Sequence, residues 1–266
     1  MQIPIGVANS VSYNLDYDPF DTLYFVAQSG FDIIQIYIND AMLADKDKLS
    51  ELKKRLLNLT DTSVYFHSDG AFNQAYTTSP YKESFFRFLR DFSEPKIIYH
   101  FDENEDLENI LKIINHFEGD HRQIYLENYF QFEGINAAEK NLRKYTAVFS
   151  LANNSGIRIH PVIDIPRFYN ARLGFSAEAA INWCFQLLNF FGNRKMPALL
   201  HLIDSRTENQ ESREFCPIGE GIIPYTEIFK FLIKNRGFLE GIILEYLDKG
   251  NPLKSRDNLY QFLKEN

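Results

Sequence analysis

The feature of this sequence that most constrains its fold is an alternation of short apolar runs with longer amphipathic segments. The short runs are rich in β-branched and aromatic residues, which predicts strands, and the longer segments carry apolar residues at helical spacing. Eight strands are expected, at residues 3–8, 32–38, 63–67, 96–101, 123–127, 157–164, 198–204 and 241–246. The helices that follow them are expected at residues 18–28, 46–59, 80–92, 106–117, 137–153, 176–191, 224–234 and 253–264.

Eight strand–helix units predict an α/β fold of the (β/α)8 or TIM barrel type. Parallel strands need crossover helices, and eight such strands close into a cylinder. The length of 266 residues suits one barrel-sized domain that spans residues 1–266. An open doubly wound sheet is the structural alternative. Its dinucleotide-binding form is disfavoured, because no GxGxxG segment follows the first expected strand.

Charge and composition narrow the class of partner. The net charge of −8 gives no general attraction to phosphate backbones or anionic lipid, so a small-molecule substrate is expected. Nucleic acid is disfavoured as a partner, although a few local arginines could still bind an anion on an acidic protein. No apolar run approaches the ~20 residues of a spanning helix, so no membrane association is expected.

The two cysteines, Cys184 and Cys216, form no CxxC motif, which favours a reducing cytoplasmic location over a disulfide scaffold. The first ten residues lack the pattern of a signal peptide. The sequence leaves assembly into a homo-oligomer open.

Ionisable residues stand at the ends of six consecutive expected strands. In (β/α)8 barrels the chemistry lies at the carboxyl ends of the strands. A single such residue is commonly a helix cap or a hydrogen-bonded core group. Several carboxylates on one rim repel one another unless a cation or an arginine compensates them. Mixed carboxylate and imidazole ligands suit Mn²⁺, Zn²⁺, Fe²⁺ or Mg²⁺. We therefore predict a divalent-metal site near His67, His100, Glu127, Asp164, His201 and Glu245.

One arrangement of these side chains would contradict the predicted metal site. If the carboxylates faced one another with an arginine in place of an ion, a metal site built from Glu127, Asp164, His201 and Glu245 would be contradicted.

Five stretches, in this order and at these strand ends, resemble the xylose isomerase-like barrels, which include sugar isomerases, sugar epimerases and endonuclease IV-type enzymes. They are IYLEN (124–128), PVIDIPR (161–167), HLIDS (201–205), CPIGEG (216–221) and GIILEY (241–246). For the sugar enzymes, the resemblance implies one divalent ion held by Glu127, Asp164, His201 and Glu245. It also implies that Glu127 and Glu245 are the catalytic acid/base pair. Such a pair fits the chemistry, because a metal that polarises a carbonyl eases deprotonation of the adjacent carbon.

For the endonuclease IV-type enzymes, the resemblance implies three zinc sites. His67, His100 and Glu127 match the first, and the Glu127–Asp164–His201–Glu245 quartet matches the second. The third site is incomplete, because Arg167 replaces a histidine and residues 213–215 (Arg-Glu-Phe) replace Asp-x-His. The departure disfavours a trinuclear phosphodiesterase. It also counts against a standard epimerase, which often keeps a histidine at the position of Arg167.

Three hypotheses follow. The first is a metal-dependent isomerase or epimerase of a small sugar or sugar derivative. Arg167, Arg206 and Arg213 would then bind a carboxylate or phosphate of the substrate, or would simply neutralise rim carboxylates. The second is an endonuclease IV-like zinc-dependent hydrolase that acts on abasic DNA. The third is a non-catalytic barrel that binds metal. One bound ion favours the first hypothesis, and two or more ions favour the second.

Overall fold

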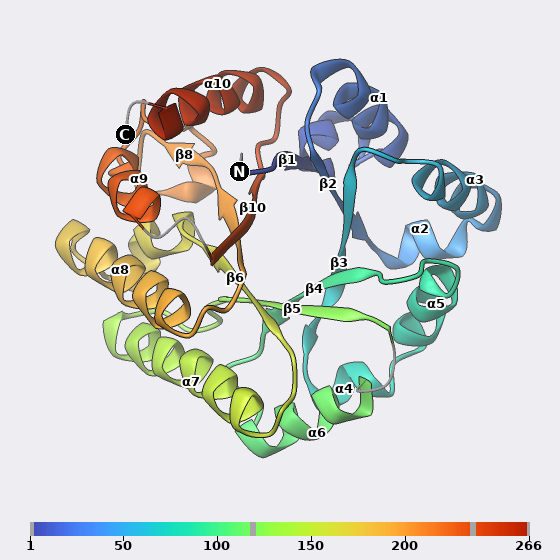
Figure 1. Ribbon diagram of the computed structural model, residues 1–266, viewed down its shortest axis with the longest axis horizontal. Coiled ribbons are helices and arrows are strands. Elements are labelled where there is room, and N and C mark those ends of the chain that lie inside the picture. Colours follow the sequence, from blue (N-terminus) through green and yellow to red (C-terminus); the bar gives the residue numbers. More distant parts are fainter. Residues whose placement is uncertain (1–2, 118–120, 235–237, 265–266) are drawn as a thin grey trace.

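The fold is a closed barrel of eight parallel strands inside a ring of helices (Figure 1). The computed structural model describes residues 3–117, 121–234 and 238–264. The strands neighbour one another in the order β1-β10-β7-β6-β5-β4-β3-β2 and then close back onto β1, and every pair is parallel. The predicted (β/α)8 fold is confirmed, and the open sheet is wrong. The barrel strands are β1 (Ile5–Ala8), β2 (Ile33–Ile38), β3 (Ser63–Phe72), β4 (Lys96–Phe101), β5 (Gln123–Glu127), β6 (His160–Asp164), β7 (Ala198–Leu202) and β10 (Leu239–Leu244).

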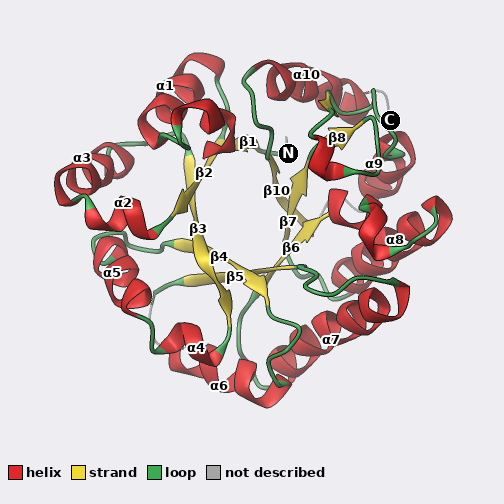
Figure 2. Ribbon diagram, turned by 180° about the vertical axis from the view of Figure 1, so that it is seen from behind, coloured by secondary structure: helices red, strands yellow, loops and turns green. Residues whose placement is uncertain are grey.

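Each barrel strand is followed by an outer helix near its predicted position (Figure 2). The outer helices are α1 (Pro19–Ser29), α3 (Lys46–Leu57), α5 (Pro80–Leu89), α6 (Leu107–Phe117), α7 (Ile135–Asn154), α8 (Ala177–Asn193), α9 (Tyr225–Lys234) and α10 (Gly250–Lys264). Local sequence fixes several of their starts. The side chains of Asp18, Ser79 and Ser176 accept backbone hydrogen bonds at the N-termini of α1, α5 and α8. Within the described ranges, no helix has both the length and the apolar character needed to cross a bilayer.

Several short elements were not predicted. They are η1 (Asn9–Leu15), α2 (Asp40–Ala44), α4 (Gln74–Thr77), η2 (Pro166–Tyr169), η3 (Ala171–Leu173), η4 (Gln210–Ser212) and an antiparallel pair, β8 (Asp204–Ser205) with β9 (Phe215–Cys216). Segments this short complete too few turns for their periodicity to be recognised. Most of them lie in the connections that follow the carboxyl ends of barrel strands, which is where the predicted site lies.

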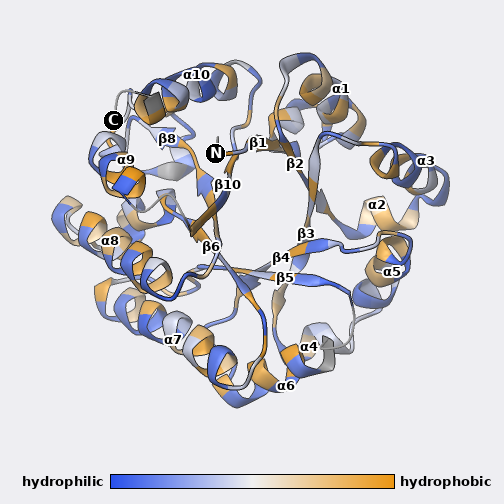
Figure 3. Ribbon diagram, viewed as in Figure 1, coloured by the Kyte–Doolittle hydropathy of each residue, from blue (hydrophilic) through white to orange (hydrophobic). Residues whose placement is uncertain are grey.

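The core has two layers. The larger layer fills the space between the strands and the helices, and Figure 3 shows orange and blue stretches alternating along the outer helices, as expected of helices with one apolar face. The inner layer fills the barrel and takes one buried residue from each strand. Its members, in chain order, are Ala8, Ile33, Tyr65, Ile98, Tyr125, Val162, Leu199 and Ile243.

Below this inner layer, at the amino-terminal ends of the strands, lies a polar network around Glu240. One Glu240 oxygen accepts hydrogen bonds from the hydroxyls of Tyr65 (2.8 Å) and Tyr125 and from Lys96 Nζ (3.0 Å). His160, which the sequence places deep in the barrel, stacks on Tyr125 and faces Glu240 at 3.7 Å. Burial alone would raise the pKa of Glu240, but the Tyr125 hydroxyl and the Lys96 charge lower it below its ordinary value.

Replacing Glu240 by glutamine should destabilise the barrel at neutral pH by about 1–3 kcal/mol, because the charged acceptor of three donors is lost. A lowered carboxyl pKa contributes stability above the unfolded-state value of about 4.5, and this stability disappears as the pH falls through the folded-state pKa. The free energy of unfolding, measured with urea at pH 7 and below pH 4, should therefore fall less on acidification for Glu240→Gln than for the wild type. Glu178→Gln, at an exposed position in the first turn of α8, is the control. Equal losses in wild type and variant would contradict the role of Glu240.

Candidate metal centre

The six predicted site residues lie inside the barrel, one layer above the inner core. Side chains alternate along a strand, so the residue two positions after a core residue points to the same side, nearer the carboxyl end. The core residues Tyr65, Ile98, Tyr125, Val162, Leu199 and Ile243 therefore place above them His67, His100, Glu127, Asp164, His201 and Glu245. The same step from Ile33 places Gln35 in this layer. Sequence reasoning missed Gln35, although it is a lone polar residue in an apolar strand.

Glu127 is the centre of the cluster and is fully buried. Its Oε2 lies 3.1 Å from His67 Nε2, 3.6 Å from His100 Nε2 and 3.5 Å from His201 Nδ1. Three imidazole nitrogens thus converge on one carboxylate oxygen. His201 Nδ1 also lies 3.4 Å from Glu245 Oε1, which accepts a hydrogen bond of 2.7 Å from Gln35.

Within the described part of the chain, several nitrogen and oxygen atoms of this cluster lack a hydrogen-bond donor, and a positive charge would satisfy them. His67 Nδ1 lies 2.9 Å from the Ser68 carbonyl oxygen, which can only accept, so Nδ1 carries a hydrogen. In the neutral imidazole, Nε2 is then an acceptor that faces another acceptor, Glu127 Oε2. Among the described residues, neither ring nitrogen of His201 has a hydrogen-bond partner, although that side chain is 1% exposed. A divalent cation, or protons in its absence, would satisfy these groups, so the residues present fit a metal ion.

Among the residues that the structure describes, two groups of side chains bring their donor atoms within 4.8 Å of one another, and both contain Glu127. The first donor group is His67, His100 and Glu127. The second donor group is Glu127, Asp164 and His201. Glu245 joins the second donor group through its contact with His201. The structure thus brings all six predicted residues together, and their role as metal ligands stays a prediction.

Arg167 lies among these carboxylates. Its Nη2 is 2.8 Å from Glu127 Oε1, and its Nε is 2.6 Å from Asp164 Oδ2. The guanidinium carbon lies 4.6 Å from the centre of the Tyr129 ring, and that ring stacks on His100 at 4.3 Å. The sequence predicts Arg167 as a rim residue that binds substrate, whereas the structure also pairs it with two predicted metal ligands.

The titration behaviour of the cluster reflects burial and crowding. Burial alone would raise the pKa of Glu127, but the charges of Arg167 and His201 lower it well below the ordinary value. Burial raises the pKa of Asp164 to about 8. Burial lowers the pKa of His100 to about 3, so His100 is neutral and able to bind metal. Burial also acts to lower the pKa of His201, but the charges of Glu245 and Glu127 raise it to about 9.

A cavity of about 510 Å³ opens onto the cluster. His67, His100, Arg167 and Glu245 line it, whereas Glu127 is not among its lining residues. The rest of its lining is mostly amide, hydroxyl and phenol groups: Asn9, Ser10, Tyr17, Gln35, Tyr37 and Asn39, with Asp16 and Ala8. Most of these come from β1, η1 and β2 and the turns that follow, a part of the chain for which sequence analysis identified no site residue.

The other two predicted substrate arginines lie elsewhere. Arg206 and Arg213 are exposed, and neither is among the residues that line the 510 Å³ cavity. Arg213 has a left-handed backbone (φ 54°), and its Nη1 donates a hydrogen bond of 2.5 Å to the Tyr13 hydroxyl. A substrate-binding role for these two residues stays a prediction.

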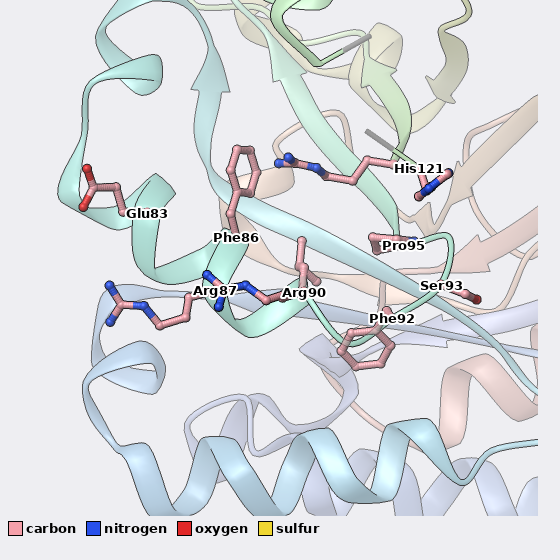
Figure 4. A pocket seen from close by; sticks show the side chains of 10 residues that line it. Glu83, Phe86, Arg87, Arg90, Phe92, Ser93, Pro95 and His121 are labelled. Carbon is pink, nitrogen blue, oxygen red and sulfur yellow. The ribbon is translucent and has the colours of Figure 1, made fainter. Parts of the chain in front are cut away.

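A second cavity, of about 500 Å³, lies away from the cluster (Figure 4). It is lined by Arg87, Arg90, His121 and Arg122, beside the segments that lead into β4 and β5. The starts of these strands are at the end of the barrel opposite the donor groups. The cavity therefore plays no part in chemistry at the predicted centre.

In its fold, this chain is similar to xylose isomerase-like barrels of known structure. No protein-family model matches the sequence, and no curated protein sequence matches it. Solved structures do match in fold. A crystal structure described as AsfvAP:AG is 15% identical, with a TM-score of 0.66 over 99% of this chain and 100% of the other.

Two further structures are similar over nearly the whole chain. The probable 3-DHS dehydratase AsbF of Bacillus anthracis is 12% identical, with a TM-score of 0.62 over 97% of this chain and 99% of the other. A xylose isomerase domain protein of Planctomyces limnophilus is 12% identical, with a TM-score of 0.59 over 99% of this chain and 96% of the other. At these identities the likeness shows the fold alone.

Proposed function

We propose that this chain is a divalent-metal-dependent enzyme that isomerises a small sugar or sugar derivative. The observation that carries the proposal is the cavity that Glu245 lines together with His67 and His100, two side chains of the first donor group. The predicted metal-binding group and the predicted carboxylate base thus border one space of sugar size. The resemblance to xylose isomerase-like barrels supports the same chemistry, as does the isomerase-domain name of one similar structure.

The two glutamates have different surroundings and would play different parts. Glu127 is fully buried and contacts Arg167 through Oε1 and the histidines through Oε2, so it would hold the ion. The Glu245 side chain is 27% exposed, lines the cavity and is oriented by Gln35, so it would exchange a proton with the substrate. A bound ion would polarise the substrate carbonyl and make the neighbouring C–H more acidic.

Of the two predicted catalytic glutamates, only Glu245 borders the cavity, which favours isomerisation over epimerisation. One carboxylate can remove a proton from one carbon and return it to the adjacent carbon on the same face. Epimerisation at one carbon needs a donor on the opposite face. Glu127, the predicted partner base, is absent from the cavity lining. Of the two sugar activities, isomerisation and epimerisation, we therefore propose isomerisation, with Glu245 as the base.

The cavity lining indicates the kind of substrate. Its amides and hydroxyls match the hydroxyl groups of a sugar, and the Tyr17 and Tyr37 rings could pack against a sugar ring. Arg167 adds a positive charge at the cavity wall, which would suit an acidic or phosphorylated sugar. A volume of about 510 Å³ accommodates a monosaccharide derivative and excludes a duplex from the cavity itself.

One observation favours the second hypothesis. The two donor groups share Glu127, an arrangement that could hold two ions around an attacking and a leaving oxygen in a hydrolase of abasic DNA. Cleavage of an abasic-site duplex by the metal-loaded protein, with no turnover of sugars, would support that hydrolase and contradict the isomerase. Inactivity on both substrate classes with metal bound would support the non-catalytic barrel.

Exchange of a substrate C–H with solvent deuterium tests the proposal directly. The protein would be loaded with Mn²⁺, Zn²⁺, Mg²⁺ or Fe²⁺ and incubated in D₂O with a panel of free, acidic and phosphorylated aldoses and ketoses. NMR should show deuterium at the carbon next to the carbonyl. Glu245→Gln should slow this exchange by about 10²–10⁴-fold, because the amide cannot accept the proton.

The metal content of Glu245→Gln should stay unchanged, because the first donor group does not include Glu245. Glu220→Gln, at an exposed position in the loop before α9, is the matched control and should exchange at the wild-type rate. Exchange by Glu245→Gln at the wild-type rate would show that another group moves the proton.

A further inference from the structure

We propose that Arg167 is a fixed cation that takes the place of a metal ion in the second donor group, so that the centre binds a single ion in the first donor group. The inference rests on the metal dependence of the proposed function and adds the number and position of the ions. Arg167 then determines the composition of the centre, in addition to any contact with substrate.

The contacts of Arg167 cover the carboxylate oxygens that a second ion would need. Both oxygens of Asp164 face it, Oδ2 toward Nε at 2.6 Å and Oδ1 toward the backbone N–H at 3.4 Å. Glu127 Oε1 accepts from Nη2 at 2.8 Å and from Nε at 3.2 Å. An ion bound to Asp164 and to this Glu127 oxygen would have to share them with a guanidinium of the same sign of charge.

The arginine is held in this position by its surroundings. It belongs to η2, a short 3-10 turn that begins at Pro166, two residues after the end of β6, and the turn directs its side chain back toward Asp164. The Tyr129 ring lies against the guanidinium. The same ring stacks on His100, so one aromatic side chain borders both donor groups.

Glu127 divides its two oxygens between the groups. Oε1 faces Arg167, and Oε2 faces His67 Nε2 and His100 Nε2. The contacts of Arg167 with Glu127 thus leave the first donor group's carboxylate oxygen to the imidazoles. Because His67 and His100 also line the cavity, an ion there would have coordination positions open to substrate.

Formal charges favour one ion. If Asp164 is ionised beside Arg167 and the imidazoles are neutral, Glu127, Asp164 and Glu245 contribute three negative charges, which Arg167 and one divalent ion balance. A second divalent ion would leave a surplus of two positive charges in a largely buried site. Unbalanced buried charge is strongly unfavourable.

Metal counting tests the inference. Full-length wild type, Arg167→Met and Arg167→Lys would each be equilibrated with Zn²⁺ or Mn²⁺, dialysed, and analysed by native mass spectrometry and elemental analysis. Wild type and Arg167→Lys should bind one ion per chain. Arg167→Met, which keeps the side-chain length without the charge, should bind two. Arg206→Met, an exposed rim arginine, is the control and should bind one.

The outcomes separate this inference from the proposed function. Two ions in the wild type, or one ion in a folded Arg167→Met, would overturn the inference and leave a metal-dependent enzyme intact. No ion in the wild type would overturn both.

If Arg167→Met fails to fold, the number of Co²⁺ ions bound by the wild type, together with their EPR signal, still tests the inference. One Co²⁺ per chain with an uncoupled high-spin EPR signal supports the inference. Two Co²⁺ ions with exchange coupling through the shared Glu127 carboxylate would refute it.

Discussion

Replacing Glu127 by glutamine should abolish metal binding and turnover while the barrel still forms. An amide offers no anionic oxygen to the ion, and its NH₂ group could donate to the imidazole nitrogens that should coordinate metal. Loss of even a partner that only orients a metal ligand lowers metal affinity about 10–100-fold. We therefore expect the affinity of Glu127→Gln to fall by more than about 100-fold, as measured by competition with a chromophoric chelator.

Thermal unfolding gives an independent measurement of the same effect. A ligand that binds only the folded state at 100 times its Kd stabilises that state by about 2.7 kcal/mol. The folded wild type should gain this stability when metal is added, and folded Glu127→Gln should gain no stability. Glu139→Gln, on the surface of α7, is the control and should behave as wild type. If Glu127→Gln kept the wild-type affinity and gain in stability, Glu127 would not be a ligand.

Replacing Asp204 by alanine should destabilise the fold more than most single substitutions. The Asp204 carboxylate is buried and accepts four backbone hydrogen bonds of 2.9–3.3 Å. The donors are the N–H groups of Ser205, Gly219, Gly221 and Ile223. Alanine would leave these N–H groups without their acceptor, and buried donors are costly to leave unsatisfied. We expect a loss of about 3–5 kcal/mol in the free energy of unfolding, measured by urea denaturation.

Asp204→Asn is the matched variant. It retains one carbonyl oxygen and should lose less stability than Asp204→Ala. Gly221→Ala should also destabilise, because an added Cβ would lie 2.2 Å from Asp204 Oδ1. A loss below about 1 kcal/mol for Asp204→Ala would show that the turn after β9 does not depend on this carboxylate.

The barrel and the gathering of the site residues were predictable from sequence for one physical reason. Side-chain alternation along a strand is strict, so a polar residue two positions after a core residue must enter the barrel near its carboxyl end. The spacing of Tyr125 and Glu127, or of Val162 and Asp164, therefore determines which layer each occupies. Repeated over consecutive strands, this spacing brings distant parts of the chain together.

The position of Arg167 was not predictable in the same way. Sequence shows only that it follows Asp164 by three residues in a loop. Whether its side chain extends into the cavity or turns back depends on η2, which is too short to show periodicity. The result is an arginine paired with two predicted ligands, the arrangement that opposes an ion held by Glu127, Asp164, His201 and Glu245. The first donor group offers the ion a different position, one built on His67 and His100.

The roles of Asp204 and Gln35 were hidden for a related reason. Asp204 appears in sequence as one more strand-end carboxylate, but its oxygens bind backbone groups of a distant turn. Gln35 supports Glu245 from 210 positions earlier in the chain. Pairings of this kind depend on tertiary contacts that no local pattern encodes.

Anomalous diffraction at the absorption edge of the bound metal tests the central claim most directly. Crystals grown with Zn²⁺ or Mn²⁺ should show one strong anomalous peak bounded by His67 Nε2, His100 Nε2 and Glu127 Oε2, with Arg167 still paired to Asp164. The absence of any peak at the strand ends, with protonated imidazoles contacting Glu127 instead, would contradict the account.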